Sequence, residues 1–154
     1  LFDAVGSLIL GKRKARFEAE LAIALERLAE KNNLQTSGYK FKLIQSKGGY
    51  ILDPRPIFKQ ITRDLKAKCR REEISWQFHR AVAEMIARTC LALRKKTKIN
   101  RVVLSGGVFQ NKILLKQSLD LLYRSGFRCF THKYLSCNDM CISLGQAVIA
   151  GYRG

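Results

Sequence analysis

Two polar turns in the last third of the chain have the residue types and spacing of a phosphate site. The run 102-VVLS-105 suits a buried strand, and Gly106 and Gly107 follow it, with Asn111 four residues further on. The first N–H groups of a helix lack helical partners and attract anions, and glycine lets a phosphate approach the backbone closely. These residues therefore predict an anion site, although a tight turn that binds nothing stays equally open.

The second turn carries a carboxylate. Asn138 and Asp139 follow an expected strand and come directly before an expected helix. Asp139 could be a plain helix cap. Ligands of open α/β sheets bind beyond the carboxyl ends of the strands, where both turns would lie. A bare turn beside an acidic one predicts a phosphate-and-metal site, with Asp139 as the metal ligand. Neither the Walker loop nor the G-x-G-x-x-G fingerprint matches.

Hydrophobic periodicity predicts the elements that position these turns. Helices are expected at 1–10, 17–33, 54–65, 72–95, 109–123 and 140–153, and strands at 39–45, 49–53, 101–105 and 127–132. Asp53 is expected to cap the third helix and Pro54 to open it. The closing β-α-β-α series indicates an α/β fold with a mostly parallel sheet. The 154 residues, 47% of them hydrophobic, suit a single domain over 1–154.

Composition limits the partners. A net charge of +17 attracts polyanions of any kind, so non-specific polyanion binding is expected. The basic clusters fall at expected helix ends or loops, namely 12–16, 66–71, 94–98 and 124–128. No uncharged apolar run of about 18 residues exists, so no membrane partner is expected. Five cysteines, an odd number, favour buried thiols in a reducing, cytoplasmic compartment. A zinc cluster of His132, Cys137 and Cys141 is the alternative, but it lacks a fourth ligand.

The runs 104-LSGGVFQNKILL-115 and 137-CNDMCISLGQAVIA-150 resemble the C-terminal end of the hydrogenase maturation carbamoyltransferases, the HypF family. Further similar segments occur upstream in the family's order, at 1–11, 17–29, 53–65 and 78–87. This domain is shared with tRNA threonylcarbamoyl transferases and antibiotic O-carbamoyltransferases. The resemblance implies the C-terminal lobe of an ASKHA-type (actin- and sugar-kinase-like) two-lobed fold, an α/β structure with a mixed sheet flanked by helices.

The resemblance also implies an activity. In that family a carbamoyl-adenylate, made from carbamoyl phosphate and ATP, passes its carbamoyl group to the C-terminal cysteine of a partner maturation protein. Gly106, Gly107 and Asn111 would face the nucleotide, with Glu18 on the ligand side. Asp139 would bind a divalent metal that is shared with an N-terminal lobe. No catalytic side chain is assigned, because the acceptor brings the thiolate.

The chain departs from the family pattern in three places. Met140 and Cys141 stand where the family has two glycines, and Ala19 and Glu20 stand where it has a glycine and a glutamine. Glu20 is expected to repel an anion unless a cation compensates it. The family's His-x-x-x-His pair is absent from this sequence. The chain is therefore expected to be one lobe of an enzyme that does not complete a turnover alone. A basic nucleic-acid-binding module and a decayed, non-catalytic interaction lobe remain the alternatives.

Overall fold

The computed structural model describes residues 1–32 and 36–153. The helices are α1 (Phe2–Leu10), α2 (Glu20–Glu30), α3 (Arg55–Lys66), α4 (Arg71–Thr97), α5 (Lys112–Arg124) and α6 (Ile142–Arg153). The strands are β1 (Lys42–Ser46), β2 (Gly49–Asp53), β3 (Arg101–Leu104) and β4 (Arg128–Thr131). Two short 3-10 helices, η1 (Gly107–Gln110) and η2 (Asp139–Cys141), follow β3 and β4. All the predicted elements are therefore present, in an α/β arrangement.

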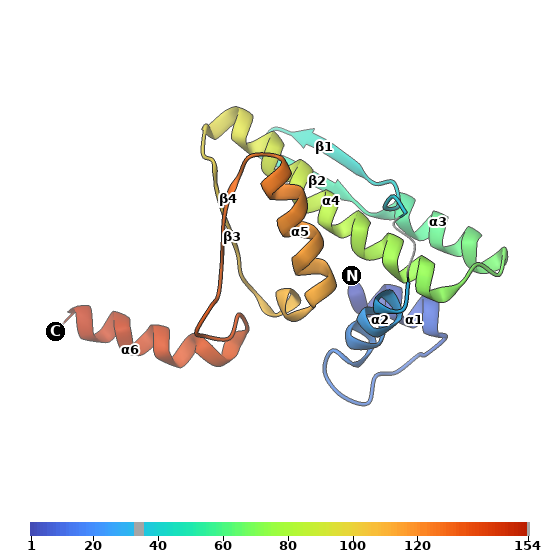
Figure 1. The fold of residues 1–154 in the computed structure, drawn as a ribbon. Coiled ribbons are helices and arrows are strands. Elements are labelled where there is room, and N and C mark those ends of the chain that lie inside the picture. The colour runs from blue at the N-terminus through green and yellow to red at the C-terminus, as the bar shows by residue number, and fades with distance from the viewer. Residues whose placement is uncertain (33–35, 154) are drawn as a thin grey trace.

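Helix α4 is the spine of the molecule, because it contributes to both hydrophobic cores (Figure 1). The larger core joins it to α1, α2 and α3 through buried side chains that include Val5, Leu25, Ile57, Ile61, Ile74 and Phe78. The smaller core joins its second half to α5 and the β3–β4 pair through Ala87, Leu104, Leu122 and Phe127. The 27 residues of α4 therefore fix α2 and α5, which carry the candidate site, on one rigid support.

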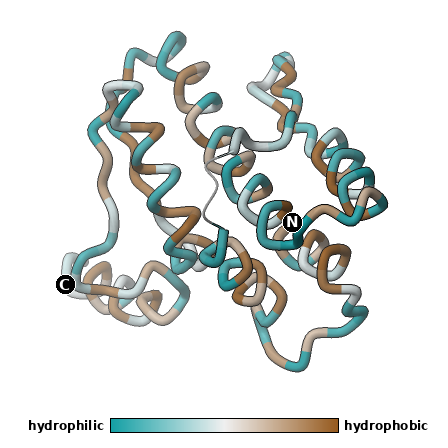
Figure 2. The backbone as a smooth tube through the Cα atoms, turned by 45° about the vertical axis from the view of Figure 1, so that its right-hand side comes forward, coloured by the Kyte–Doolittle hydropathy of each residue, from teal (hydrophilic) through white to brown (hydrophobic). Residues whose placement is uncertain are grey.

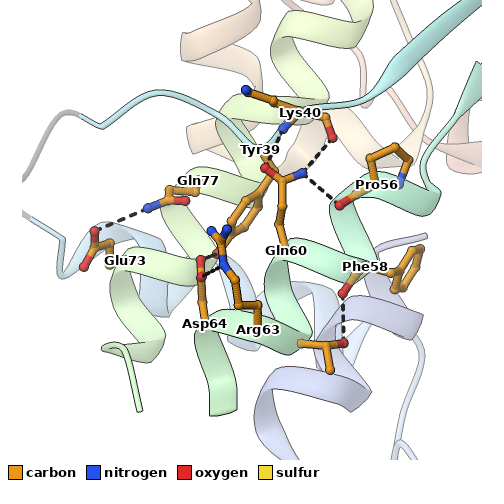
Figure 3. A network of polar contacts seen from close by, with 10 residues as sticks. Tyr39, Lys40, Pro56, Phe58, Gln60, Arg63, Asp64, Glu73 and Gln77 are labelled. Atoms are coloured by element: carbon orange, nitrogen blue, oxygen red, sulfur yellow. Dashed lines mark hydrogen bonds and ion pairs between the residues drawn. The ribbon is translucent and has the colours of Figure 1, made fainter. Parts of the chain in front are cut away.

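The extended segment before β1 is tied to α3 and α4 (Figure 3). Tyr39 donates its hydroxyl to Asp64 Oδ2 at 2.9 Å, and its burial together with that carboxylate raises the pKa of Tyr39. The Gln60 side chain bonds the backbone N–H and C=O of Lys40. Gly38 lies so close to α4 that a Cβ there would be 2.5 Å from the Ala81 nitrogen. These contacts therefore hold the segment that leads into β1 against α3 and α4.

The strands form two separate two-stranded sheets, where one mostly parallel sheet was predicted. β1 pairs with β2 in an antiparallel hairpin, and β3 pairs with β4 in parallel, with Val102 opposite Cys129. Helix α5 crosses between β3 and β4, so the β-α-β prediction is confirmed for this pair. Val103 is 68% exposed and Phe130 is 45% exposed. Since parallel strands are usually covered on both faces, this pair leaves apolar surface uncovered.

Helix α6 extends away from the body of the molecule (Figure 1). Its apolar residues, visible as brown segments in Figure 2, are exposed and include Ile142, Leu144, Val148 and Ile149. None of the described helices is long and apolar enough to cross a membrane. Exposed apolar surface of this kind is typical of interaction sites.

Several predicted boundaries differ from the structure. α2 begins at Glu20, three residues later than predicted, and Asn33, the last residue of that prediction, lies outside the described residues. Asp53 does not cap α3 in the predicted way, since Pro54 holds the cap position. Instead, Asp53 accepts bonds from the Arg55 N–H and guanidinium, which lower the pKa of Asp53 to about 2. Asp53 therefore bonds the N–H of the first residue of α3 from outside the helix and also pairs with the guanidinium of that residue.

The four basic clusters do lie in loops or at helix ends, as predicted. The prediction of buried thiols is wrong: Cys69 is exposed and the other four are half-buried. All five thiols are free. Cys90 and Cys129 pack against the smaller core, so the thiols are neither fully buried nor gathered into one cluster.

Candidate nucleotide site

The turn between β3 and η1 requires its first glycine for conformation. Gly106 has a φ of 105°, in the region that side chains disfavour, and its N–H donates to Cys137 O at 2.9 Å. Gly107 does not share the positive φ, and a Cβ there would meet only Asn138 Cβ at 3.7 Å. The two glycines therefore differ in role. Gly106 allows the positive φ of the turn, and Gly107 leaves open space where a side chain would stand.

Single alanine substitutions separate these roles. We expect Gly106→Ala to lower the free energy of unfolding by about 1–3 kcal/mol, the cost of a strained backbone residue. Gly107→Ala should change it by less than about 0.5 kcal/mol. Gly48→Ala, in the β1–β2 turn with no atom within 4 Å of the added Cβ, is the matched control. Urea denaturation measures all three, and an equal loss for Gly106→Ala and Gly107→Ala would contradict the assignment.

The two predicted turns do lie side by side. Besides the bond from Gly106 to Cys137, Gln110 Nε2 reaches Ser136 Oγ at 3.5 Å. Asn138 caps η2, accepting from Met140 N–H at 3.2 Å, so the plain-cap interpretation of Asp139 is wrong. Asp139 is exposed and is the first residue of η2. Its carboxylate is therefore free of the capping role, and the residue that approaches the glycine turn is the preceding one, Asn138.

A cavity of about 360 Å³ opens between η1, the start of α5 and α2. Most of its lining is apolar, and a few polar side chains complete the lining. The lining residues are Phe2, Ala19, Ala22, Ile23, Glu26, Gly107, Val108, Gln110 and Asn111. Its volume and mostly apolar lining fit the small-molecule sites of proteins. Of the predicted site residues, Gly107 and Asn111 line this cavity, and Gly106 adjoins it. Glu18 and Asp139 do not line it. Glu18 precedes Ala19, which does line the cavity, and Asp139 follows Asn138, whose Cβ lies 3.7 Å from the position of a Cβ at Gly107.

Asn111 is held by a buried chain of hydrogen bonds that joins α2, α4 and α5. Its Oδ1 accepts from Leu114 N–H at 2.9 Å, which caps α5, and its Nδ2 donates to His79 Nε2 at 2.9 Å. His79 Nδ1 donates to Ser75 O at 2.8 Å, and Ser75 Oγ donates to Leu25 O at 2.6 Å. This chain uses part of the Asn111 amide, so the residue predicted to face the nucleotide also orients the helix that borders the cavity.

His79 is neutral in this arrangement. Its Nε2 must accept from Asn111, because the Asn111 oxygen is already the cap of α5. Burial lowers the pKa of His79 to about 4, against a smaller opposing effect of the bond to Ser75. Phe2, which lines the cavity, packs edge-on against the His79 ring at 5.3 Å. His79 is therefore a buried part of the packing and of the hydrogen-bonded network.

Glu26 is a residue of the cavity that sequence reasoning missed. Its Oε1 accepts from Lys112 N–H at 2.7 Å, across 86 residues of sequence. A carboxylate at the first turn of a helix is stabilised by the helix dipole. Glu26 therefore occupies part of the anion-attracting N-terminal end of α5. The only sequence signal was its place one helical turn after Ala22.

The predicted repulsion by Glu20 is compensated. Glu20 accepts from Arg16 N–H at 2.7 Å and from Lys12 Nζ at 2.9 Å, and it is only 6% exposed. The backbone bond from Arg16, followed by the Lys12 bond, lowers the pKa of Glu20 to about 2. The extra carboxylate thus fastens the basic loop between α1 and α2.

Ala19, by contrast, is strained. It has a φ of 61° at the N-terminus of α2, where the family pattern has glycine. A left-handed conformation costs an L-residue roughly 1–2 kcal/mol, partly offset because alanine is less flexible than glycine when unfolded. We therefore expect Ala19→Gly to raise the free energy of unfolding by about 0.5–1 kcal/mol, measured by urea denaturation. A loss of stability would show that the backbone is relaxed there.

The described residues contain no group of three or more histidine, cysteine or acidic side chains that could hold a metal ion. The zinc alternative is therefore not supported. His132 Nε2 lies 2.8 Å from Ser105 Oγ, and His132 forms no metal-binding group with Cys137 and Cys141. Divalent cations such as Mg²⁺ require about six oxygen ligands. Asp139 supplies one carboxylate, so within the described residues the fit to a metal is incomplete.

Comparison with known proteins identifies the chain's relatives. Residues 1–146 match the family model described as the carbamoyltransferase Kae1-like domain, second subdomain. The chain belongs to this family. It is 32% identical over 146 residues to the carbamoyltransferase HypF of Synechocystis sp., covering 95% of this chain and 18% of that protein. It is 31% identical over 86 residues to the tRNA N6-adenosine threonylcarbamoyltransferase of Thermosipho melanesiensis, covering 56% of this chain and 26% of that protein.

Solved structures agree with this assignment. Full-length HypF in a phosphate- and nucleotide-bound form superposes with a TM-score of 0.88 at 38% identity, over 97% of this chain and 19% of that one. HypF of T. kodakarensis superposes with a TM-score of 0.79 at 21% identity, which shows the shared fold. The predicted HypF resemblance and the ASKHA-related α/β fold are confirmed. This Kae1-like subdomain spans about a fifth of the length of the HypF proteins it matches.

Proposed function

We propose that this Kae1-like subdomain is the nucleotide-binding half of a carbamoyltransferase of nickel-iron hydrogenase maturation. The observation that carries the proposal is the cavity beside Gly107. It combines an apolar wall on α2 with a glycine turn at the start of η1 and a carboxylate turn next to it. A relative of the same fold is known in a phosphate- and nucleotide-bound form, which supports a nucleotide as the ligand.

In this proposal the nucleoside lies against the apolar wall formed by Phe2, Ala22 and Ile23. Its phosphate approaches the backbone at Gly106 and Gly107, where no side chain intervenes. Asn111 offers its second amide N–H to the ligand while the first holds His79. The contacts are those of a site that binds and orients, with no nucleophile of its own.

The ligand would be ATP or carbamoyl-adenylate. A thiolate at the C-terminus of a partner maturation protein attacks the carbamoyl carbon, the bond from that carbon to the phosphate oxygen breaks, and AMP leaves. Glu18, next to the cavity-lining Ala19, would border the ligand. Asp139 would supply one ligand to a divalent metal, with the others coming from an N-terminal lobe outside this chain. A bound cation would polarise the phosphate oxygens. The five free thiols favour the cytoplasm as the place of reaction.

Calorimetric titration of the chain with ATP and Mg²⁺ in 0.5 M salt tests the proposal. At that ionic strength the Debye length is about 4 Å, so diffuse attraction to the basic surface is screened. We expect saturable binding that Asp139→Ala weakens at least tenfold, since the metal loses its only ligand from this chain. Glu30→Ala, which removes an exposed carboxylate at the end of α2 that lines neither this cavity nor those between α4 and α5, is the matched control.

The outcomes separate the proposal from its rivals. Binding that falls log-linearly with salt and is indifferent to Asp139→Ala would identify a polyanion-binding module. The absence of binding to either ATP or nucleic acid at 0.5 M salt would identify an interaction lobe without a ligand. Either result would overturn the nucleotide half-site.

A further inference from the structure

Two neighbouring cavities lie between α4 and α5, and they are separate from the cavity of the candidate nucleotide site. The first, of about 290 Å³, is lined by Trp76, Arg80, Ile113, Lys116, Gln117, Asp120 and Arg124. The second, of about 270 Å³, shares Trp76, Arg80, Asp120 and Arg124 with it. Four shared residues make them one groove. Its residues differ entirely from those that line the cavity beside Gly107.

Unmet hydrogen-bonding groups are concentrated at this groove. Gln117 is only 6% exposed, yet neither its Nε2 nor its Oε1 has a partner. The indole N–H of Trp76 is likewise buried and unpaired. Leaving such groups unsatisfied costs stability, and native proteins do so rarely. Two side chains that line the groove therefore carry donor and acceptor groups that have no protein partner.

The charge of the groove is positive. Across both cavities, three cationic side chains, Arg80, Lys116 and Arg124, stand against two carboxylates, Glu84 and Asp120. Arg80 and Arg124 bond Glu84 and Asp120 through Nε, which leaves their terminal nitrogens available. Lys116 makes no ion pair within the part of the chain that the structure describes. The groove thus offers several cationic donors to an oxygen-rich anion.

We infer that this groove binds a nucleoside monophosphate unit, at a site separate from the cavity beside Gly107. The phosphate fits the cations Arg80, Lys116 and Arg124. The base fits the Gln117 amide, which can donate to and accept from one edge of adenine, and the aromatic ring of Trp76.

Trp76 is the only tryptophan of the chain, so its indole N–H resonance reports on the groove alone. In the experiment the ¹⁵N-labelled chain is titrated with AMP in 0.5 M salt. We expect a saturable shift of the Trp76 signal. Gln117→Leu should weaken binding at least tenfold and raise the urea midpoint, because it removes an unpaired buried amide. Lys116→Met should weaken binding several-fold, whereas Lys112→Met, one turn earlier on α5 and outside the groove, should leave it unchanged.

Further arms identify the source and separate the two sites. Oligoadenylate that binds more tightly than AMP at this salt concentration would assign the groove to single-stranded nucleic acid, and equal affinity would assign it to free nucleotide. Gly107→Ala should retain the shift of the Trp76 signal on addition of AMP. The inference about the groove can therefore hold even where the proposed function of the cavity beside Gly107 fails. An unshifted Trp76 signal, an unchanged affinity in Gln117→Leu, or an equal response to inorganic phosphate alone would overturn the inference.

Discussion

Asn111→Leu is expected to lower the free energy of unfolding by about 3 kcal/mol, the largest loss among the substitutions considered. The change removes the cap of α5, which is worth about 1 kcal/mol. It also leaves His79 Nε2, in a fully buried ring, without its donor, which costs roughly 1–3 kcal/mol. Urea denaturation at neutral pH measures the loss. Because Asn111 also lines the cavity, the same variant should bind ATP more weakly.

A matched substitution isolates the buried network from capping in general. Asn138 caps η2 through Met140 N–H but has no histidine partner in the described structure. We expect Asn138→Leu to cost less than about 1 kcal/mol. A loss for Asn111→Leu no larger than that for Asn138→Leu would contradict the role assigned to the link between His79 and Asn111.

Acidification from about pH 6.5 to about pH 4 is expected to lower the free energy of unfolding by about 3 kcal/mol through His79 alone. The pKa of His79 is about 4 in the folded chain, against an ordinary value of 6.5. Between these values the unfolded chain binds a proton that the folded chain does not, so stability rises with pH across this window. Protonation of Nε2 would also set an N–H against the Asn111 amide.

Histidine substitutions test this assignment. His79→Gln should remove the slope between pH 6.5 and pH 4, measured by urea denaturation across the range, whereas His132→Gln should retain it. A second loss, which overlaps the acid end of that window, is expected from about pH 4.5 to about pH 2, because the folded pKa values of Glu20 and Asp53 are both about 2. These carboxylates must be protonated before their ion pairs break. A slope that persists in His79→Gln would contradict the buried neutral histidine.

The sequence predicted the parts of the site that are local. A strand, two glycines and a helix are contiguous, and so are the residues around Asp139, so their turns could be read from residue types. The adjacency of the two turns also followed from parallel pairing, which places the carboxyl ends of β3 and β4 together. The need for glycine at Gly106 is of the same local kind, since it depends on a single φ.

The parts that were missed depend on packing between distant segments. Glu26 reaches Lys112 across 86 residues, and His79 reaches Asn111 across 32. No periodicity predicts which faces of α2, α4 and α5 meet. The unpaired Gln117 and Trp76 are of the same kind, because an amide on a helix has no sequence signal that it will be buried without a partner. The start of α2 lies at Glu20, three residues later than predicted, and that of α3 at Arg55, one residue later.

Calorimetric titration of Gly107→Ala with ATP and Mg²⁺ in 0.5 M salt, beside the wild-type chain and Gly48→Ala, tests the central claim most directly. The account predicts that Gly107→Ala unfolds at the wild-type urea midpoint yet binds ATP at least tenfold more weakly. Gly48→Ala should match the wild type in both. Unchanged ATP affinity in Gly107→Ala would contradict the claim that the second glycine leaves room for a phosphate.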